Sequence, residues 1–283
     1  MSRKLIIDSG CDLPLDHNIE IEENLPILVY VDDKEYKDKV EIYPKDMYKM
    51  MRDGSLVRTA QIPYAYFREK FEQYAKTGDE YLYIVFSSGL SGTYNTARLV
   101  YEEILEDYPD FKMEIVDSLN AVGGYGVLVK KASEILKDYD DIKDLGNRVR
   151  EMSKYIESIF TVDDLEYLFR GGRVSRTSAL LGGVLNIKPI LEVRDGKLDP
   201  LEKIRGKKKV YKRIVEMVKE RLDGNSLSDV YISHADDIDS ADKLKEKLLE
   251  AFDIEDIEYT EVSCAIGAHS GPGTLAVFFY NEK

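Results

Sequence analysis

The stretch Tyr81–Tyr94, with the sequence YLYIVFSSGLSGTY, combines a strand-like segment, a polar loop and the start of a helix. Tyr81–Phe86 is apolar and rich in aromatic and β-branched residues, which favours a buried strand. The helical pattern of Thr93–Asp107 ends before Pro109. A strand that leads directly into a helix is the repeating unit of a parallel α/β sheet, so this stretch predicts the fold class of the chain.

The same alternation extends through the first half of the chain. Apolar segments predict three further strands, at Leu5–Asp8, Ile27–Val31 and Met113–Val116. The expected helices are Pro44–Arg52, Tyr64–Lys76, Val122–Lys137 and Ile142–Tyr155. We therefore expect an α/β domain with a largely parallel sheet in residues 1–156.

The second half contains a strong hairpin signal. Asp195-Gly196 separates two strand-like segments, and this dipeptide favours a tight antiparallel turn. We therefore expect a second α/β domain with a mixed sheet in residues 157–283. Its other expected elements are strands at Ile159–Val162, Val230–Ser233, Ile257–Val262 and Thr274–Tyr280 and helices at Leu165–Phe169, Lys207–Leu222 and Ala241–Phe252.

The composition excludes some classes of function. The chain has 283 residues and a net charge of −14, from 54 acidic and 40 basic residues. A general nucleic-acid binder normally carries a basic excess, so we expect no nucleic-acid partner. No stretch approaches the roughly 18 unbroken apolar residues of a membrane span, so we expect no transmembrane segment.

The cysteines and histidines indicate the compartment and argue against a metal site. Cys11 and Cys264 are the only cysteines and form no CxxC pair, which fits a reducing compartment. The apolar run Leu5–Ile7 is too short for a signal peptide, so we expect a cytoplasmic protein. The three histidines lie far apart in the sequence without metal-ligand spacing, and we expect no structural metal.

Small polar residues follow three of the predicted strands, at Asp8-Ser9, Ser87-Ser88 and Asp117-Ser118. The carboxyl ends of parallel strands meet at one edge of a sheet, where ligands bind. The same residues are equally suited to cap the helices that follow them. The sequence therefore predicts a ligand-binding edge, a set of helix caps, or both.

The loop Ser87–Gly92 has features of an anion site, because its hydroxyls precede a helix N-terminus. It lacks the Gly-Lys-Ser/Thr ending of a phosphate loop. Gly89-Leu90-Ser91-Gly92 approaches the GxSxG pattern of a nucleophile elbow, but Thr93 replaces the last glycine. A capping residue followed by a tight turn is the alternative interpretation.

Three other segments hold candidate contacts. Thr59 lies in an expected loop between two helices, and His269 precedes the turn Gly271-Pro272-Gly273, where the backbone can approach a ligand closely. Each side chain is suited either to a ligand contact or to a bond within its loop. The basic run Lys203–Lys209 begins a helix, where positive charge opposes the macrodipole, so it slightly favours contact with an anion or an acidic partner.

Taken together, these segments resemble the DegV family of bacterial fatty-acid-binding proteins. The matching motifs occur in the family's order: DSGCDL at Asp8–Leu13, TAQIP at Thr59–Pro63, SSGLSGTY at Ser87–Tyr94, LEYLFRGGRVS at Leu165–Ser175 and HSGPGT at His269–Thr274. The family usually has Ser where Ala60 stands and Pro where Ile62 stands. These departures concern the shape of the loop and leave the Thr59 hydroxyl in place.

The resemblance implies a long-chain fatty acid at the interface of two α/β domains. It assigns the binding of the carboxylate to Thr59, Ser91 and His269. The nearby loop contacts that it implies are Ser88, Gly92, Ser270 and Gly271.

The resemblance also implies partners. In family members, a fatty acid kinase catalytic subunit converts the bound acid to an acyl-phosphate, which then enters phospholipid synthesis through an acyl-phosphate-using acyltransferase. Arg173 and Arg205 would contact the acyl-phosphate or the kinase, with Arg170 as a second candidate for the place of Arg173. The binding protein itself needs no cofactor and catalyses no reaction alone.

The residues leave alternatives open. The run Leu180–Leu185 is suited to wall a tunnel for a fatty acid, and equally to form a core helix. A serine esterase, with Ser91 as nucleophile and His269 as base, is the second hypothesis, although no orienting acid is evident near His269. A sugar- or phosphate-binding regulatory module is the third, and the apolar run argues against it.

Overall fold

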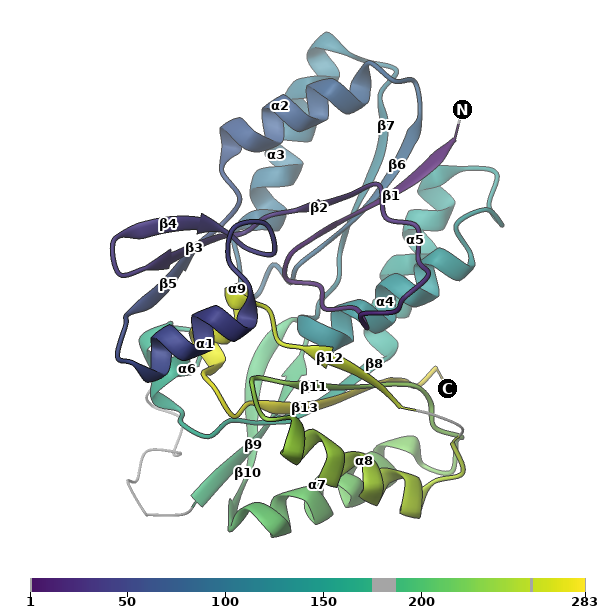
Figure 1. Cartoon of the computed structure of the whole chain (residues 1–283). Coiled ribbons are helices and arrows are strands. Elements are labelled where there is room, and N and C mark those ends of the chain that lie inside the picture. Colours follow the sequence, from purple (N-terminus) through teal and green to yellow (C-terminus); the bar gives the residue numbers. More distant parts are fainter. Residues whose placement is uncertain (1, 175–186, 255–256, 283) are drawn as a thin grey trace.

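The computed structural model describes residues 2–174, 187–254 and 257–282. In this part of the chain, two large sheets carry helices, and a third, smaller sheet lies beside the first (Figure 1). The predicted α/β class is confirmed. No helix among these residues is long and apolar enough to cross a membrane.

The first sheet has the strand order β2-β1-β6-β7, and all its strand pairs are parallel, as predicted. Its strands are β1 (Arg3–Asp8), β2 (Glu23–Leu25), β6 (Glu80–Val85) and β7 (Lys112–Asp117). The helices of this half are α2 (Tyr64–Ala75), α3 (Thr93–Asp107), α4 (Val122–Glu134) and α5 (Ile142–Met152). α2 and α3 lie on one side of the sheet and α5 on the other, so its central strands are apolar on both faces (Figure 1).

The small sheet is antiparallel, in the order β4-β3-β5. Its elements and the helix that follows β4 are β3 (Leu28–Val31), β4 (Lys34–Lys37), β5 (Val57–Ala60) and α1 (Pro44–Arg52). The sequence predicted neither β4 nor β5, because each has only four residues, with charged side chains among them. The expectation that Thr59 lies in a loop between two helices is therefore wrong, since Thr59 lies on β5.

The second large sheet has the order β10-β9-β8-β13-β11-β12 and is mixed, as predicted, because only β11 and β12 pair in parallel. Its strands are β8 (Ile156–Thr161), β9 (Ile187–Arg194), β10 (Lys197–Arg205), β11 (Ser228–His234), β12 (Glu258–Glu261) and β13 (Leu275–Tyr280). The predicted turn at Asp195-Gly196 joins β9 to β10, and both residues have positive φ (48° and 76°), as this tight turn requires. α7 (Lys207–Leu222) and α8 (Ile238–Ala251) cover one face (Figure 1).

α4 lies between the two large sheets. The Asp8 N–H of β1 donates to the hydroxyl of Tyr125 (3.2 Å), which ties α4 to the first sheet. Gly123 and Gly124 face Phe278 of β13 so closely that a Cβ at either position would press into its ring. Tyr125 and Phe278 therefore belong to one core that spans both sheets.

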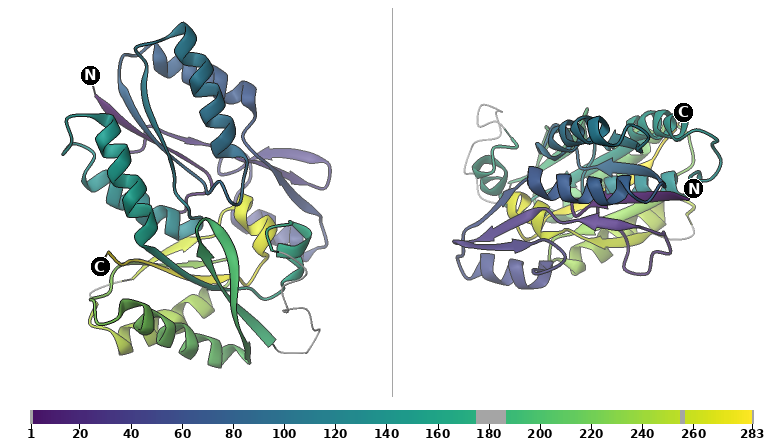
Figure 2. Two further views of the ribbon diagram at one scale, coloured as in Figure 1. Left: turned by 180° about the vertical axis from the view of Figure 1, so that it is seen from behind. Right: turned by 90° about the horizontal axis from the view of Figure 1, so that it is seen from above.

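Two short helices complete the second half, α6 (Glu166–Arg170) and α9 (Cys264–Ser270). The sequence placed His269 in a loop, and the structure corrects this, since His269 lies in the last turn of α9. α9 packs against α1, β3 and β5, at the junction of the two halves (Figure 2). α9 has only seven residues, too few to show a helical period, and Gly267 among them disfavours a helix, which is why the pattern missed it.

The predicted boundary between residues 156 and 157 falls at the start of β8, directly after a short 3₁₀ helix, Ser153–Tyr155. This boundary stays a prediction. The run Leu180–Leu185 and Ser175, the last residue of the fourth motif, lie outside the described residues.

Candidate functional site

A cavity lies at the junction of the two large sheets, the small sheet and α9. About 840 Å³ of it is not filled by atoms, and part of this space is open to solvent. Its lining is mainly apolar and comes from both halves of the chain, including Ile27, Phe86, Val122, Phe160, Val262 and Phe278.

Polar side chains line one part of this cavity: Thr59, Ser91, Arg173 and His269. Thr59 Oγ1 and His269 Nε2 are 2.6 Å apart and share a hydrogen bond. They meet because β5 and α9 pack together. All three residues that the resemblance assigned to a carboxylate, Thr59, Ser91 and His269, thus line the same cavity.

His269 is held in its neutral form. Burial, together with the charge of Arg173, lowers the pKa of His269 to about 4. Burial also lowers the pKa of Arg173 itself. At neutral pH, His269 therefore has one protonated nitrogen, while the cationic Arg173 supplies positive charge.

The loop that carries Ser91 is fixed from both halves. Ser91 Oγ lies 2.9 Å from Thr93 Oγ1 and accepts a bond from the Thr93 N–H (3.2 Å), so this hydroxyl satisfies the first N–H of α3 while Ser91 lines the cavity. Ser87 Oγ donates to the Gly196 carbonyl of the hairpin turn (2.7 Å). Both interpretations of the loop, a cap and a ligand contact, are thus compatible with one geometry.

Arg173 lies where the cavity meets an outer groove. Its Nε donates to the Leu90 carbonyl (3.1 Å) and its Nη1 to the Gly171 carbonyl (2.5 Å). Leu90, Ser91, Arg173 and Leu198 line both the cavity and the groove. The groove and the cavity thus lie on either side of these shared residues.

The four predicted loop contacts are divided between these spaces. Ser88 and Gly92 line the outer groove. Ser270 lines the cavity, and its buried Oγ has no hydrogen-bond partner among the described residues. Gly271 has a φ of 78° and packs against the ring of Tyr167, so it shapes the turn rather than the lining.

Two predicted arginines lie elsewhere. Arg205 is exposed at the end of β10, opposite Ile187 in the strand register, and lines neither the cavity nor the groove. Arg170 is exposed and lies over the ring of Tyr167, 5.0 Å from its centroid. Of the three arginines named from the sequence, only Arg173 contacts the cavity.

The sequence missed two groups of site residues. Lys197, which lines the groove, follows the Asp195-Gly196 turn, and only the folded hairpin brings it to the loop near Gly89. The apolar lining residues Ala265 and Ile266 belong to α9, which had no pattern of its own. Among the described residues, no group of three or more His, Cys, Asp or Glu side chains could hold a metal ion.

Comparisons with known proteins match the whole chain. The DegV family model, described as an uncharacterised protein family, matches residues 2–282. A DegV domain-containing protein of Clostridium perfringens is 38% identical over 286 residues, which cover 99% of this chain and 98% of the relative.

Solved structures share the fold. A DegV family protein of Thermus thermophilus, described by its fatty acid binding, aligns over 100% of both chains with a TM-score of 0.88 and 27% identity. The fatty acid kinase (Fak) B3 protein of Streptococcus pneumoniae, solved with linoleic acid, aligns over 100% of both chains with a TM-score of 0.85 and 24% identity. Because the family model and the Clostridium perfringens relative both match almost the entire sequence, this protein belongs to the DegV family.

Proposed function

We propose that this protein binds a long-chain fatty acid, with the hydrocarbon tail in the cavity and the carboxylate at its polar part. The observation that carries the proposal is an apolar cavity with a hydroxyl, an imidazole and a guanidinium gathered in one part of its lining. A fatty-acid site needs an apolar wall for the tail and convergent hydrogen-bond donors for the carboxylate. The fatty acid binding described for the Thermus thermophilus relative supports the choice of ligand.

Burial of the tail supplies most of the expected affinity. About 14 methylenes at ~0.8 kcal/mol each correspond to roughly 11 kcal/mol of gross stabilisation. Hydrogen bonds to the charged carboxylate contribute ~1.5–3 kcal/mol each. The net affinity is smaller, because association and ordering of the tail cost free energy. We therefore expect changes at the polar residues to weaken and misplace the ligand without abolishing binding.

The carboxylate is bound by donors from both halves. In the proposed complex, the neutral His269 donates its Nε2–H to Thr59 Oγ1, which frees the Thr59 O–H for the carboxylate. Ser91 donates from the start of α3, and Arg173 supplies positive charge. The buried Ser270 Oγ is a further donor, because no described residue engages it.

We further propose that the protein presents this carboxylate to the catalytic subunit of a fatty acid kinase, which forms an acyl-phosphate for phospholipid synthesis. The groove at Arg173 supports this step, because it shares Ser91 and Arg173 with the cavity lining and carries the second cation Lys197. Arg173 and Arg205 are the proposed contacts to the acyl-phosphate or the kinase. On this proposal, the protein is a cytoplasmic carrier that catalyses no reaction alone and passes its product to an acyl-phosphate-using acyltransferase.

The geometry does not favour the serine esterase. His269 Nε2 bonds to Thr59, whereas Ser91 Oγ bonds to Thr93, so the two supposed catalytic groups have different partners. A pKa of about 4 also makes His269 a weak base. With an activated acyl ester, we expect no burst of alcohol release and no acyl group on Ser91.

Lipid extraction tests the binding proposal directly. Denaturing extraction of purified protein and mass spectrometry should find about one long-chain fatty acid per chain, because an empty apolar cavity favours occupancy. Ala276→Leu adds an isopropyl group to the buried lining and should lower this load, whereas Leu249→Phe, on an exposed position of α8, should not. Absence of lipid, together with no binding of added palmitate or oleate, would refute the proposal.

A reconstituted reaction tests the kinase step. The wild-type protein with palmitate, ATP and the cognate catalytic subunit should form acyl-phosphate, and omission of either protein should abolish it. Acyl-phosphate formed at the same rate without this protein would contradict the presenting role.

A further inference from the structure

α9 begins with its backbone N–H groups bonded to carboxylates from the other half of the chain. The Ser263 N–H donates to Asp12 Oδ2 (3.0 Å). The Cys264 and Ala265 N–H groups donate to Asp38 Oδ1 and Oδ2, at 3.2 and 3.1 Å. Two aspartates that follow β1 and β4 therefore hold the start of the helix that carries His269.

This arrangement is costly for a simple helix cap. Asp12 and Asp38 are 2% and 0% exposed, and burial raises the pKa of Asp38 to about 6. One cation, Lys39, lies with them and donates to Asp12 Oδ1 at 2.6 Å. Ser263 stands at the N-cap, where its own hydroxyl could serve, yet it makes no capping bond. Because one hydroxyl could not accept from three backbone N–H groups, the two buried carboxylates fix the start of α9 more firmly than a serine cap would.

Both ends of α9 are bound to the same small sheet. Asp38 directly follows β4, and Thr59 lies on β5, while both strands pair with β3. Ala265 and His269 lie about 6 Å apart along the helix axis, little more than one turn. We therefore expect them to move together. A shift at the start of α9 is therefore carried to the imidazole, while Thr59 stays in place.

We infer that Asp38, supported by Asp12 and Lys39, is a positioning residue that sets the hydrogen bond between Thr59 and His269. The inference deepens the proposed function and rests on it for the effect on fatty acid affinity. Its effect on His269 concerns the ligand-free protein and holds independently of any ligand.

The variant Asp38→Asn tests this role. Asparagine keeps one acceptor oxygen, but its amide N–H₂ faces the second backbone N–H, so the start of α9 must move. In ¹⁵N-histidine-labelled, ligand-free protein, we expect the ring resonances of His269 to shift, because its bond to Thr59 changes. With only three histidines in the chain, the His269→Gln spectrum identifies the signal. We expect palmitate to bind about tenfold more weakly, the equivalent of part of one charge-assisted hydrogen bond.

A second variant serves if Asp38→Asn does not fold. Tyr48 donates its hydroxyl to the Val262 carbonyl, just before α9 (2.9 Å), and Tyr48→Phe removes that bond alone. It should shift the His269 resonances in the same way but less.

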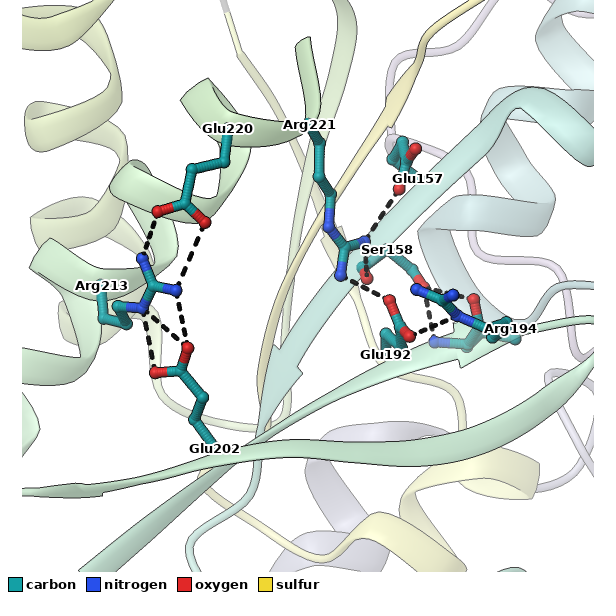
Figure 3. Close-up of polar contacts among 9 residues, drawn as sticks. Glu157, Ser158, Glu192, Arg194, Glu202, Arg213, Glu220 and Arg221 are labelled. Carbon is teal, nitrogen blue, oxygen red and sulfur yellow. Dashed lines mark hydrogen bonds and ion pairs between the residues drawn. The ribbon is translucent and has the colours of Figure 1, made fainter. Parts of the chain in front are cut away.

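The matched control is a buried carboxylate outside this network. Glu192, on β9, is 3% exposed and bonds to Arg221 and Arg194 (Figure 3). Glu192→Gln should cost stability, yet leave the His269 resonances in place and palmitate affinity unchanged within about twofold.

The outcomes separate the two proposals. Unshifted His269 resonances in the folded Asp38 or Tyr48 variant overturn the positioning role, whatever happens to affinity. Equal shifts in Glu192→Gln overturn it as well, since they would reflect general loosening. A wild-type protein that binds no palmitate refutes the proposed function, while the spectra of the ligand-free variants still decide on Asp38.

Discussion

Acid is expected to destabilise this protein through His269. Its pKa in the folded protein is about 4, against an ordinary value of 6.5, because burial and Arg173 disfavour the imidazolium. Between these values the unfolded chain binds a proton that the folded protein excludes. The stability that neutral His269 contributes is therefore complete above pH 6.5 and is lost as the pH falls toward 4. At ~1.4 kcal/mol per pKa unit, the full loss is about 3 kcal/mol, of which about 2 kcal/mol is lost by pH 5.

Urea unfolding followed by circular dichroism measures this effect in the wild type and in His269→Gln, at pH 7.5 and pH 5. From pH 7.5 to pH 5, the free energy of unfolding should fall by about 2 kcal/mol more in the wild type than in His269→Gln. Taking the difference matters, because burial raises the pKa of Asp8 to about 7 and that of Asp38 to about 6. These two groups oppose His269, since their protonation stabilises the folded state as the pH falls. A difference that stays constant between the two pH values would refute the reasoning about His269.

Three further predictions concern the site and the thiols. Thr59→Ala combined with Ser91→Ala should weaken palmitate binding by roughly 10²- to 10⁴-fold, because two hydrogen bonds to a charged group, worth ~1.5–3 kcal/mol each, are lost, with little change in the melting temperature. Unchanged affinity by calorimetry would show that these hydroxyls do not bind the carboxylate. Arg173→Ala and Arg205→Ala should retain palmitate but lose much of the kinase-coupled formation of acyl-phosphate, and full turnover in either variant would remove that arginine from the proposed step. Both cysteines are unpaired and buried, so thiol titration should detect two thiols after unfolding and few before, whereas a disulfide in fresh protein would contradict the proposed compartment.

The parts of the fold that depend on residues close together in the sequence could be predicted from it. The segment Tyr81–Tyr94 combines an apolar strand with a polar loop and a helix start, and the structure has β6 and α3 there. The turn Asp195-Gly196 requires positive φ at both positions, which these two residues tolerate well. Each signal lies within a few residues of the feature that it predicts.

The parts that depend on contacts between distant segments could not be predicted. β5 is a four-residue strand of mixed polarity that exists because β3 offers it a partner. α9 has seven residues, and its N-terminal N–H groups are satisfied by Asp12 and Asp38, more than 200 positions earlier in the chain. The motif resemblance located Thr59 and His269, but not the hydrogen bond between them, because that bond depends on how β5 and α9 pack.

The position of α4 bears on how this protein unfolds and on how the proposed ligand would leave. Tyr125 ties the helix to the first sheet, while Gly123 and Gly124 bring it against Phe278 of the second, so each sheet uses α4 as part of its own core. Loss of structure in either sheet would expose apolar surface of this shared core, so we expect the two sheets to unfold together. The same shared core opposes a hinge-like opening between the halves, so we expect the proposed ligand to enter and leave by local movement at the rim of the cavity.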